Sequence, residues 1–156
     1  MKKIDNARLV IAGPAEEGYQ KILEKMVKNL GIENKVLFTG FIGAHDKKMT
    51  FIDADIFVNV RQDEIFGLVF LEANACGTPV ICSKGCGIAN VIDGETGIAV
   101  SYNEDQVENA IIKILNNDNL RKRFGEKGKK LVMEKFGWDS VVRTVDGIYE
   151  DCIYNI

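Results

Sequence analysis

Two carboxylates, Glu64 and Glu72, stand eight residues apart around an apolar segment. Glu64 precedes the expected start of a helix over about Gly67–Cys76, and Glu72 lies within that helix. An ionised carboxylate only accepts hydrogen bonds, so Glu72 suits the two adjacent hydroxyl groups of a ribose. The unpaired N–H groups and the positive dipole end at the start of the helix suit a phosphate. This arrangement predicts nucleotide binding, with Glu64 facing the group beyond the phosphates, which is the sugar in a nucleotide-sugar.

The residue types and their spacing also allow a second interpretation. Asp63 and Glu64 could merely complement the helix dipole, and Glu72 could bond to a neighbouring backbone group or form an ion pair. Because the residues around Glu72 are apolar, an unpaired carboxylate there would be costly, and we expect it to have a dedicated partner. Nearby, Gly85 and Gly87 fit an anion-binding nest and a plain turn equally well. From spacing alone, the functional and structural interpretations remain open.

The segments that must position these residues follow an alternating pattern. Apolar runs ended by turn residues predict strands at Arg8–Ala12, Val36–Thr39, Ile56–Val60, Pro79–Cys82 and Ile98–Val100. Apolar residues at helical spacing predict helices at Tyr19–Leu30, Asp46–Asp53, Gly67–Cys76 and Ala89–Ile92, with three more after residue 104. We therefore expect an α/β fold with a Rossmann-like parallel sheet flanked by helices on both faces, and ligands bound at the carboxyl ends of its strands.

Composition limits the classes of protein that fit. The length of 156 residues predicts a single domain over residues 1–156, and 46% hydrophobic with 28% charged residues is typical of a globular protein. The net charge of -3 argues against nucleic acid and anionic membranes as partners. We see no export signal or spanning segment and expect a cytoplasmic chain. Four cysteines and one histidine, His45, lack the usual ligand pairs of a zinc site, so we expect no metal.

The run from Glu64 to Val80, E-I-F-G-L-V-F-L-E-A-N-A-C-G-T-P-V, resembles the E-x7-E signature of family-4 glycosyltransferases, retaining enzymes of the GT-B architecture. The similarity covers nearly the whole chain, at Leu9–Pro14, Val36–Gly40, Ala54–Val58, Gly87–Ile88, Asp93–Gly97, and Phe136 with Trp138. The resemblance implies the carboxyl-terminal, donor-binding half of a GT-B fold. It also implies a UDP- or GDP-sugar as the donor, with no cofactor and no metal.

The resemblance assigns roles to particular residues. It implies that Glu64 lies at the reaction centre beside the donor sugar and that Glu72 binds the ribose. It places backbone groups against sugar and phosphate oxygens at Ile65, Phe66, Gly67 and Leu68. It further implies that Gly13 passes near the donor and that Phe41 and Ile42 frame the nucleobase.

The departures from the family pattern set a limit on this expectation. Compared with the family pattern, we expect the chain to begin after the first strand and helix, whose loop supplies the diphosphate cations in the family, and to lack the amino-terminal acceptor-binding domain. We therefore expect it to be inactive alone, and to be peripheral at a membrane only in a full enzyme. Arg61 or Lys84 could replace those cations or simply be solubilising charges. The alternative function is a non-catalytic interaction module, or a donor-binding subunit that joins an acceptor-binding chain or a second copy.

Overall fold

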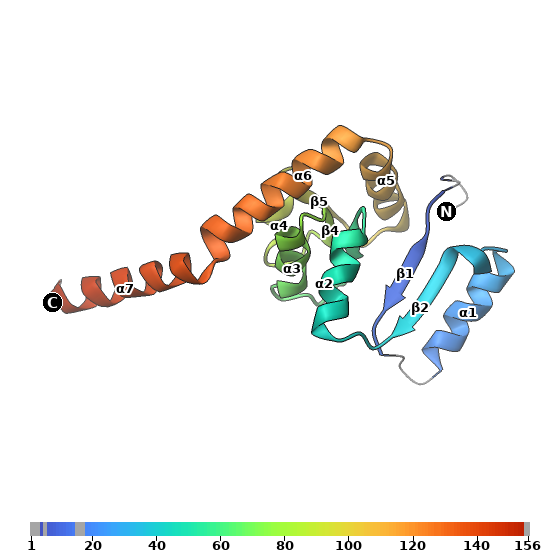
Figure 1. The fold of residues 1–156 in the computed structure, drawn as a ribbon, viewed down its shortest axis with the longest axis horizontal. Coiled ribbons are helices and arrows are strands. Elements are labelled where there is room, and N and C mark those ends of the chain that lie inside the picture. Colours follow the sequence, from blue (N-terminus) through green and yellow to red (C-terminus); the bar gives the residue numbers. More distant parts are fainter. Residues whose placement is uncertain (1–3, 5, 15–17, 155–156) are drawn as a thin grey trace. The chain divides into compact units, whose positions relative to one another are not determined.

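The structure is a computed structural model that describes residue 4 and residues 6–14 and 18–154. The chain divides into two compact units, residues 1–47 and 48–156, both within the predicted domain. The expected strands and helices are present (Figure 1), and their ends differ from the predicted ones by at most two residues. All strand pairs are parallel, as predicted, but the strands form two sheets rather than one, a pair β1-β2 and a triplet β3-β4-β5. The fold is α/β and Rossmann-like.

The first unit contains a two-stranded parallel sheet and the helix that connects its strands. Its elements are β1 (Leu9–Ala12), α1 (Tyr19–Asn29), a short 3-10 turn at Glu33–Lys35 and β2 (Val36–Gly40). Leu9 lies opposite Val36 in the sheet. Gly31 has a φ of 65° and follows α1, which confirms the predicted left-handed helix end. None of the described residues up to Lys47 is buried, so this unit has no core of its own.

The second unit holds the hydrophobic core. It comprises most of α2 (Ala44–Asp53), then β3 (Phe57–Asn59), α3 (Leu68–Cys76), β4 (Val80–Ser83), α4 (Ala89–Ile92), β5 (Gly97–Val100), α5 (Glu104–Leu115), α6 (Asp118–Leu131) and α7 (Trp138–Tyr154). The central strand β4 is buried along its whole length. Since side chains alternate along a strand, Val80 and Cys82 pack on one face of the sheet and Ile81 packs on the other.

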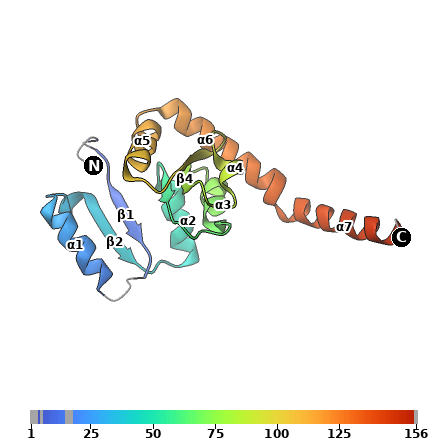
Figure 2. The same ribbon diagram turned by 180° about the vertical axis from the view of Figure 1, so that it is seen from behind.

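Helices cover both faces of this sheet, as the apolar strands predict. On one face, Phe70 of α3 and Ile92 of α4 join the core that contains Val80 and Cys82. On the other face, Ile114 of α5 and Phe124 of α6 pack against Ile81. Figure 2 shows α3 and α4 on one side of β4 and α5 on the other. The site segment between β3 and α3 is therefore fixed at both ends by a packed three-layer core.

Close contact between α3 and α6 depends on two glycines. A Cβ atom on Gly125 would collide with the backbone oxygen of Gly77, which ends α3. One turn further along α6, a Cβ on Gly128 would lie 2.9 Å from Oδ1 of the buried Asn74. The Asn74 Nδ2 donates a hydrogen bond to Thr96 Oγ1 at 3.1 Å. Glycine thus lets the backbone of α6 approach the carboxyl end of α3.

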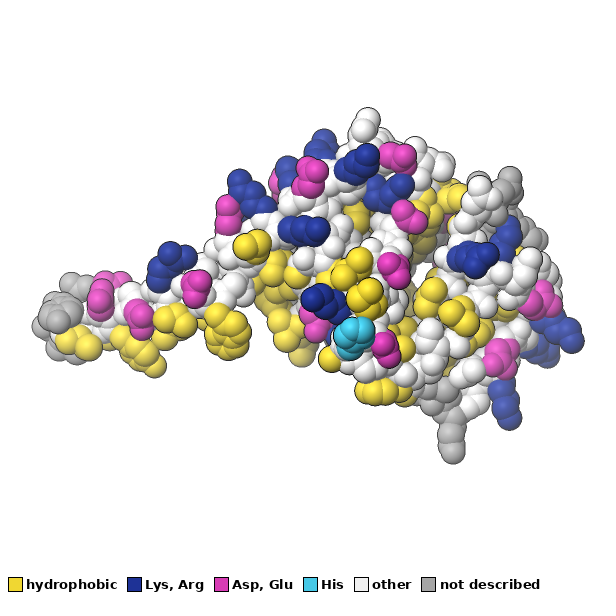
Figure 3. All heavy atoms as spheres, in the orientation of Figure 1, with side chains coloured by type: hydrophobic (Ala, Val, Ile, Leu, Met, Phe, Trp, Pro, Cys, Tyr) yellow, Lys and Arg dark blue, Asp and Glu magenta, His cyan; other side chains and the backbone are white. Residues whose placement is uncertain are grey.

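The helix α7 follows a π-helical segment at Val132–Phe136 that the sequence pattern does not predict. Figure 3 shows hydrophobic side chains along one side of α7. Their exposed members recur at helical spacing at Trp138, Val141, Val142, Val145, Ile148, Tyr149 and Ile153. No helix within the described part of the chain is long and apolar enough to cross a membrane.

Candidate functional site

The start of α3 is shaped by Gly67. This residue has a φ of 80°, a left-handed conformation that side chains rarely adopt, and it directly precedes Leu68 at the first helical position. A Cβ on Gly67 would also lie 2.5 Å from the Phe70 ring. The Phe70 N–H donates to the Gly67 oxygen at 3.0 Å, whereas the first N–H groups of a helix have no acceptor within it. The predicted helix start is therefore present at Leu68, and its anion-binding role stays a prediction.

The segment from Arg61 to Phe66 that leads into α3 is held by the loop after β4. Ser83 Oγ donates to the Arg61 oxygen at 2.6 Å, and the Gly87 N–H donates to the Ile65 oxygen at 3.0 Å. Cys86 Sγ donates to the Phe66 oxygen at 3.2 Å. Because the Gly87 N–H is used in this way, the structural interpretation of this glycine is favoured over a phosphate nest.

The predicted site residues of this unit differ in exposure, and Gly67 is buried. Ile65 is 89% exposed and Leu68 is 67% exposed, while Glu64 is half-buried. The Phe66 ring packs edge-on against Phe136, with the ring centroids 6.4 Å apart. Phe66 is still 42% exposed, so part of its side chain remains open to solvent despite this contact.

Glu72 is exposed, which corrects the expectation that its apolar neighbours surround it. The helix buries Phe70, Leu71, Ala73 and Asn74 and leaves an open stripe at Leu68, Glu72 and Ala75. Residues four apart lie on the same helix face, so Glu72 sits one turn beyond Leu68, about 6 Å along the axis. Glu72 also interacts within the chain, as expected. Its position therefore combines an open face with a neighbouring helix start.

The other predicted site residues lie in the first unit, at the carboxyl ends of β1 and β2. The Gly13 N–H donates to the Gly40 oxygen at 2.9 Å. Phe41 is 80% exposed and Ile42 is half-buried. The structure thus brings Glu64, the helix start and Glu72 together in one unit, and it brings Gly13 close to Gly40 in the other.

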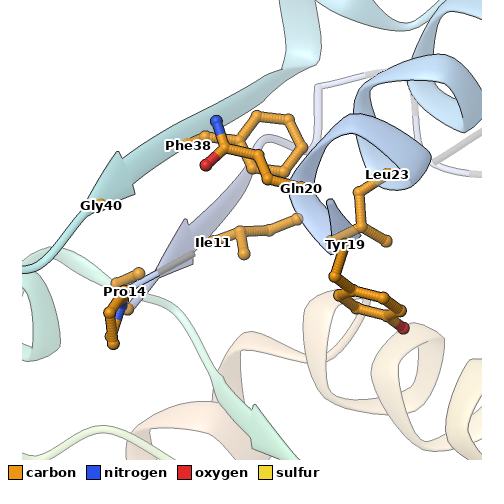
Figure 4. A pocket seen from close by; sticks show the side chains of 9 residues that line it. Ile11, Pro14, Tyr19, Gln20, Leu23, Phe38 and Gly40 are labelled. Atoms are coloured by element: carbon orange, nitrogen blue, oxygen red, sulfur yellow. The ribbon is translucent and has the colours of Figure 1, made fainter. Parts of the chain in front are cut away.

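A pocket of about 300 Å³ opens in the first unit beside these strand ends. Figure 4 shows the side chains of Ile11 and Phe38 on the strands and those of Gln20 and Leu23 on α1 around it. The remaining lining residues are Ala12, Gly13, Pro14, Tyr19 and Gly40. Of these nine residues, only Gly13 was predicted as a site residue. The others carry ordinary strand and helix patterns, which gave no signal of a pocket.

Few charged groups accompany the start of α3. Arg61 and Lys84 are both exposed and follow neighbouring parallel strands, so both start from the same edge of the sheet. Among the residues that the structure describes, no group of three His, Cys, Asp or Glu side chains is placed to hold a metal ion. Both cations lie at the carboxyl ends of β3 and β4, where the segment that leads into α3 begins.

All four cysteines are free thiols, and they differ sharply in exposure. Burial, with smaller effects of Cys86 and Asp93, raises the pKa of the Cys82 thiol to about 12. We expect iodoacetamide at pH 8 to label the exposed Cys152 and to leave Cys82 unmodified, because the thiolate is the reactive form. Peptide mass spectrometry after a timed reaction measures this difference. Unfolded protein in urea should react at both positions, and equal labelling of the two in the folded protein would contradict the prediction.

Comparison with known protein families decides what this fold belongs to. The family model described as "Glycosyl transferases group 1" matches residues 1–131. The chain belongs to this family of glycosyltransferases. The N-acetyl-alpha-D-glucosaminyl L-malate synthase of Bacillus anthracis is 34% identical over 151 residues, which cover 95% of the chain and 38% of that enzyme. The chain spans 31% to 38% of the length of the curated relatives compared with it.

Solved structures of glycosyltransferases match the fold of the chain. The C-terminal domain of a group 1 glycosyltransferase from Francisella tularensis is 29% identical, with a TM-score of 0.81 over 88% of this chain and 73% of that one. An Anabaena protein, HepE, solved in complex with UDP, matches with a TM-score of 0.83 over 94% of this chain and 42% of that one, at 21% identity. The resemblance expected from the sequence is therefore confirmed at the level of the GT-B carboxyl-terminal domain.

Proposed function

We propose that this chain binds the nucleotide-diphospho-sugar donor of a retaining glycosyltransferase of family 4. The carrying observation is the start of α3, where Gly67 opens the helix and Glu72 lies on the same exposed face as Leu68. In this proposal the diphosphate binds the N–H groups from Phe66 to Leu68, and Glu72 accepts hydrogen bonds from the ribose. Glu64 lies beside the sugar. Gly13 approaches the donor, and Phe41 and Ile42 frame the base.

The chemistry of this donor is group transfer with a charged leaving group. The bond between sugar C1 and a diphosphate oxygen breaks, and C1 forms a bond to a hydroxyl oxygen of the acceptor, which gives up its proton. The departing diphosphate keeps the bonding electrons and gains negative charge. The helix start, with Arg61 and Lys84 at the same edge, would stabilise that charge without a metal ion or other cofactor. A UDP- or GDP-sugar is the proposed donor. The UDP bound to HepE, which shares this fold, supports the choice of nucleotide class.

Turnover in this proposal needs a second part that binds the acceptor. Support comes from the length of the relatives, since the chain spans less than two fifths of the Bacillus anthracis synthase. The acceptor-binding part would be contributed by the same polypeptide or by a separate chain, in the cytoplasm or at a membrane surface. Membership in a glycosyltransferase family favours this function over a non-catalytic interaction module.

Isothermal titration calorimetry with UDP and with GDP tests donor recognition. We expect saturable heat for one of the two nucleotides, with a dissociation constant between about 1 μM and 1 mM, and no heat for adenosine monophosphate at the same concentration. The preferred nucleotide identifies the base that is recognised. Absence of heat for both nucleotides at millimolar concentration would contradict donor binding by this chain.

A further inference from the structure

The loop after β4 fixes the backbone beside the proposed donor site from within the protein. Three groups of this loop donate hydrogen bonds to three carbonyl oxygens of the segment that precedes α3. Ser83 Oγ donates to Arg61, the Gly87 N–H donates to Ile65, and Cys86 Sγ donates to Phe66. We call these donors, Ser83, Cys86 and Gly87, the carbonyl clamp. We propose that the clamp positions the Ile65–Leu68 backbone for the donor diphosphate, and that Ser83 and Cys86 are positioning residues of the site.

The bonds to Ile65 and Phe66 also fix the direction of the neighbouring N–H groups. A trans peptide is planar, and its carbonyl and N–H groups point in opposite directions. A carbonyl that accepts from the clamp therefore directs the N–H of the following residue away from the loop. Holding the oxygens of Ile65 and Phe66 in this way turns the N–H groups of Phe66 and Gly67 outward, away from the clamp.

Burial and close packing make the clamp rigid. Ser83 is 4% exposed and ends the buried strand β4, and Cys86 is also 4% exposed. The Cys86 Sγ lies 3.2 Å from the position of a Cβ on Gly67, and a Cβ on Gly87 would collide with the Ile65 oxygen. These contacts leave the loop and the segment little room to move apart. The clamp thus connects the segment before α3 to the buried core of the sheet.

Small residues are required for this contact. Gly87 brings its own N–H against the Ile65 carbonyl because it has no side chain. Cys86 packs against Gly67, and its thiol is a weak donor to the neighbouring Phe66 oxygen. The inference rests on the proposed function only for its consequence, nucleotide affinity. The ordering of the segment follows from the structure itself and is measured separately.

The test compares Cys86→Ala, Cys86→Ser and Ser83→Ala in the full 156-residue chain. Cys82→Ala is the matched control, since it removes a buried thiol from β4 that forms none of the three bonds. Amide order parameters from nitrogen-15 relaxation report the rigidity of Ile65–Leu68, and calorimetry with UDP and GDP reports affinity. The reference value is the wild-type order parameter, which we expect to be about 0.85, as in rigid backbone generally.

Cys86→Ala and Ser83→Ala should each lower these order parameters and raise the nucleotide dissociation constant about threefold to tenfold. Cys86→Ser keeps a donor at the same position and should restore both readouts toward wild type, which simple loss of packing would not predict. Cys82→Ala should lower the melting temperature while leaving the segment rigid.

Order parameters and affinities unchanged in both alanine variants would overturn the clamp. So would equal loosening of the segment by Cys82→Ala, or a serine variant no better than alanine in both readouts. If the wild-type chain binds neither UDP nor GDP, the donor proposal fails. The order parameters still decide the clamp in that case, because they do not depend on a bound nucleotide.

Discussion

Replacing Glu72 by alanine is expected to raise the dissociation constant for the preferred nucleotide by about tenfold to a hundredfold, since hydrogen bonds to charged groups contribute about 1.5 to 3 kcal/mol. Glu72 is exposed on α3, and alanine is the most favourable helical residue, so the fold should persist. Calorimetry measures the affinity and circular dichroism confirms the helix content. Glu126→Ala, which removes an exposed carboxylate from α6, is the matched control and should bind as wild type does.

The ligand supplies the second half of this test. If Glu72 binds the ribose, the wild type should bind the 2′-deoxy nucleotide more weakly than the ribonucleotide. Glu72→Ala should bind the two with nearly equal affinity, because the carboxylate that distinguishes them is gone. A variant that still discriminates as strongly as the wild type would show that the ribose is read by another group.

The second large effect concerns stability. Gly125→Ala should lower the free energy of unfolding by about 2 kcal/mol or more, because its Cβ would collide with the Gly77 backbone oxygen and the helices must separate. Gly147→Ala on α7 is the matched control, since no atom lies within 4 Å of its Cβ position. That variant should gain up to about 1 kcal/mol from the better helix propensity of alanine.

Urea unfolding followed by circular dichroism measures both changes. Equal effects of the two substitutions would mean that helix propensity, rather than contact between α3 and α6, decides the outcome. A stability for Gly125→Ala within about 0.5 kcal/mol of wild type, the range of ordinary surface changes, would also contradict the close approach of these helices.

The elements of the fold were predictable because local chemistry marks them. The short apolar run Pro79–Cys82 predicted the buried central strand β4, and Gly67 marked the start of α3. The pairing of strands was harder to predict. Alternation of strands and helices indicates a parallel arrangement, but each strand's hydrogen-bond partners depend on the complete set of strands, so the division into two sheets was not foreseen.

The donor site stays a prediction, and it was proposed at residues whose type and spacing indicate a particular chemistry. Glu64, Gly67 and Glu72 were identified from a carboxylate, a turn glycine and a second carboxylate at defined spacing. The exposure of Glu72 was not predicted, because α3 is apolar on nearly all sides and its sequence does not reveal which side faces solvent. Ser83 and Cys86 were not assigned a role, since their partners lie about twenty residues away and are backbone oxygens, which any sequence contains.

The strand order of the second unit has a consequence for how the protein is made. In the sheet β3-β4-β5, each strand pairs with the one that precedes it in the chain. A strand emerging during synthesis therefore finds its neighbour already present, separated only by the helix that connects them. Contacts of this kind have short sequence separation, which favours fast folding. The sheet β3-β4-β5, which holds the segment before α3, can thus assemble strand by strand during translation, before α7 has left the ribosome.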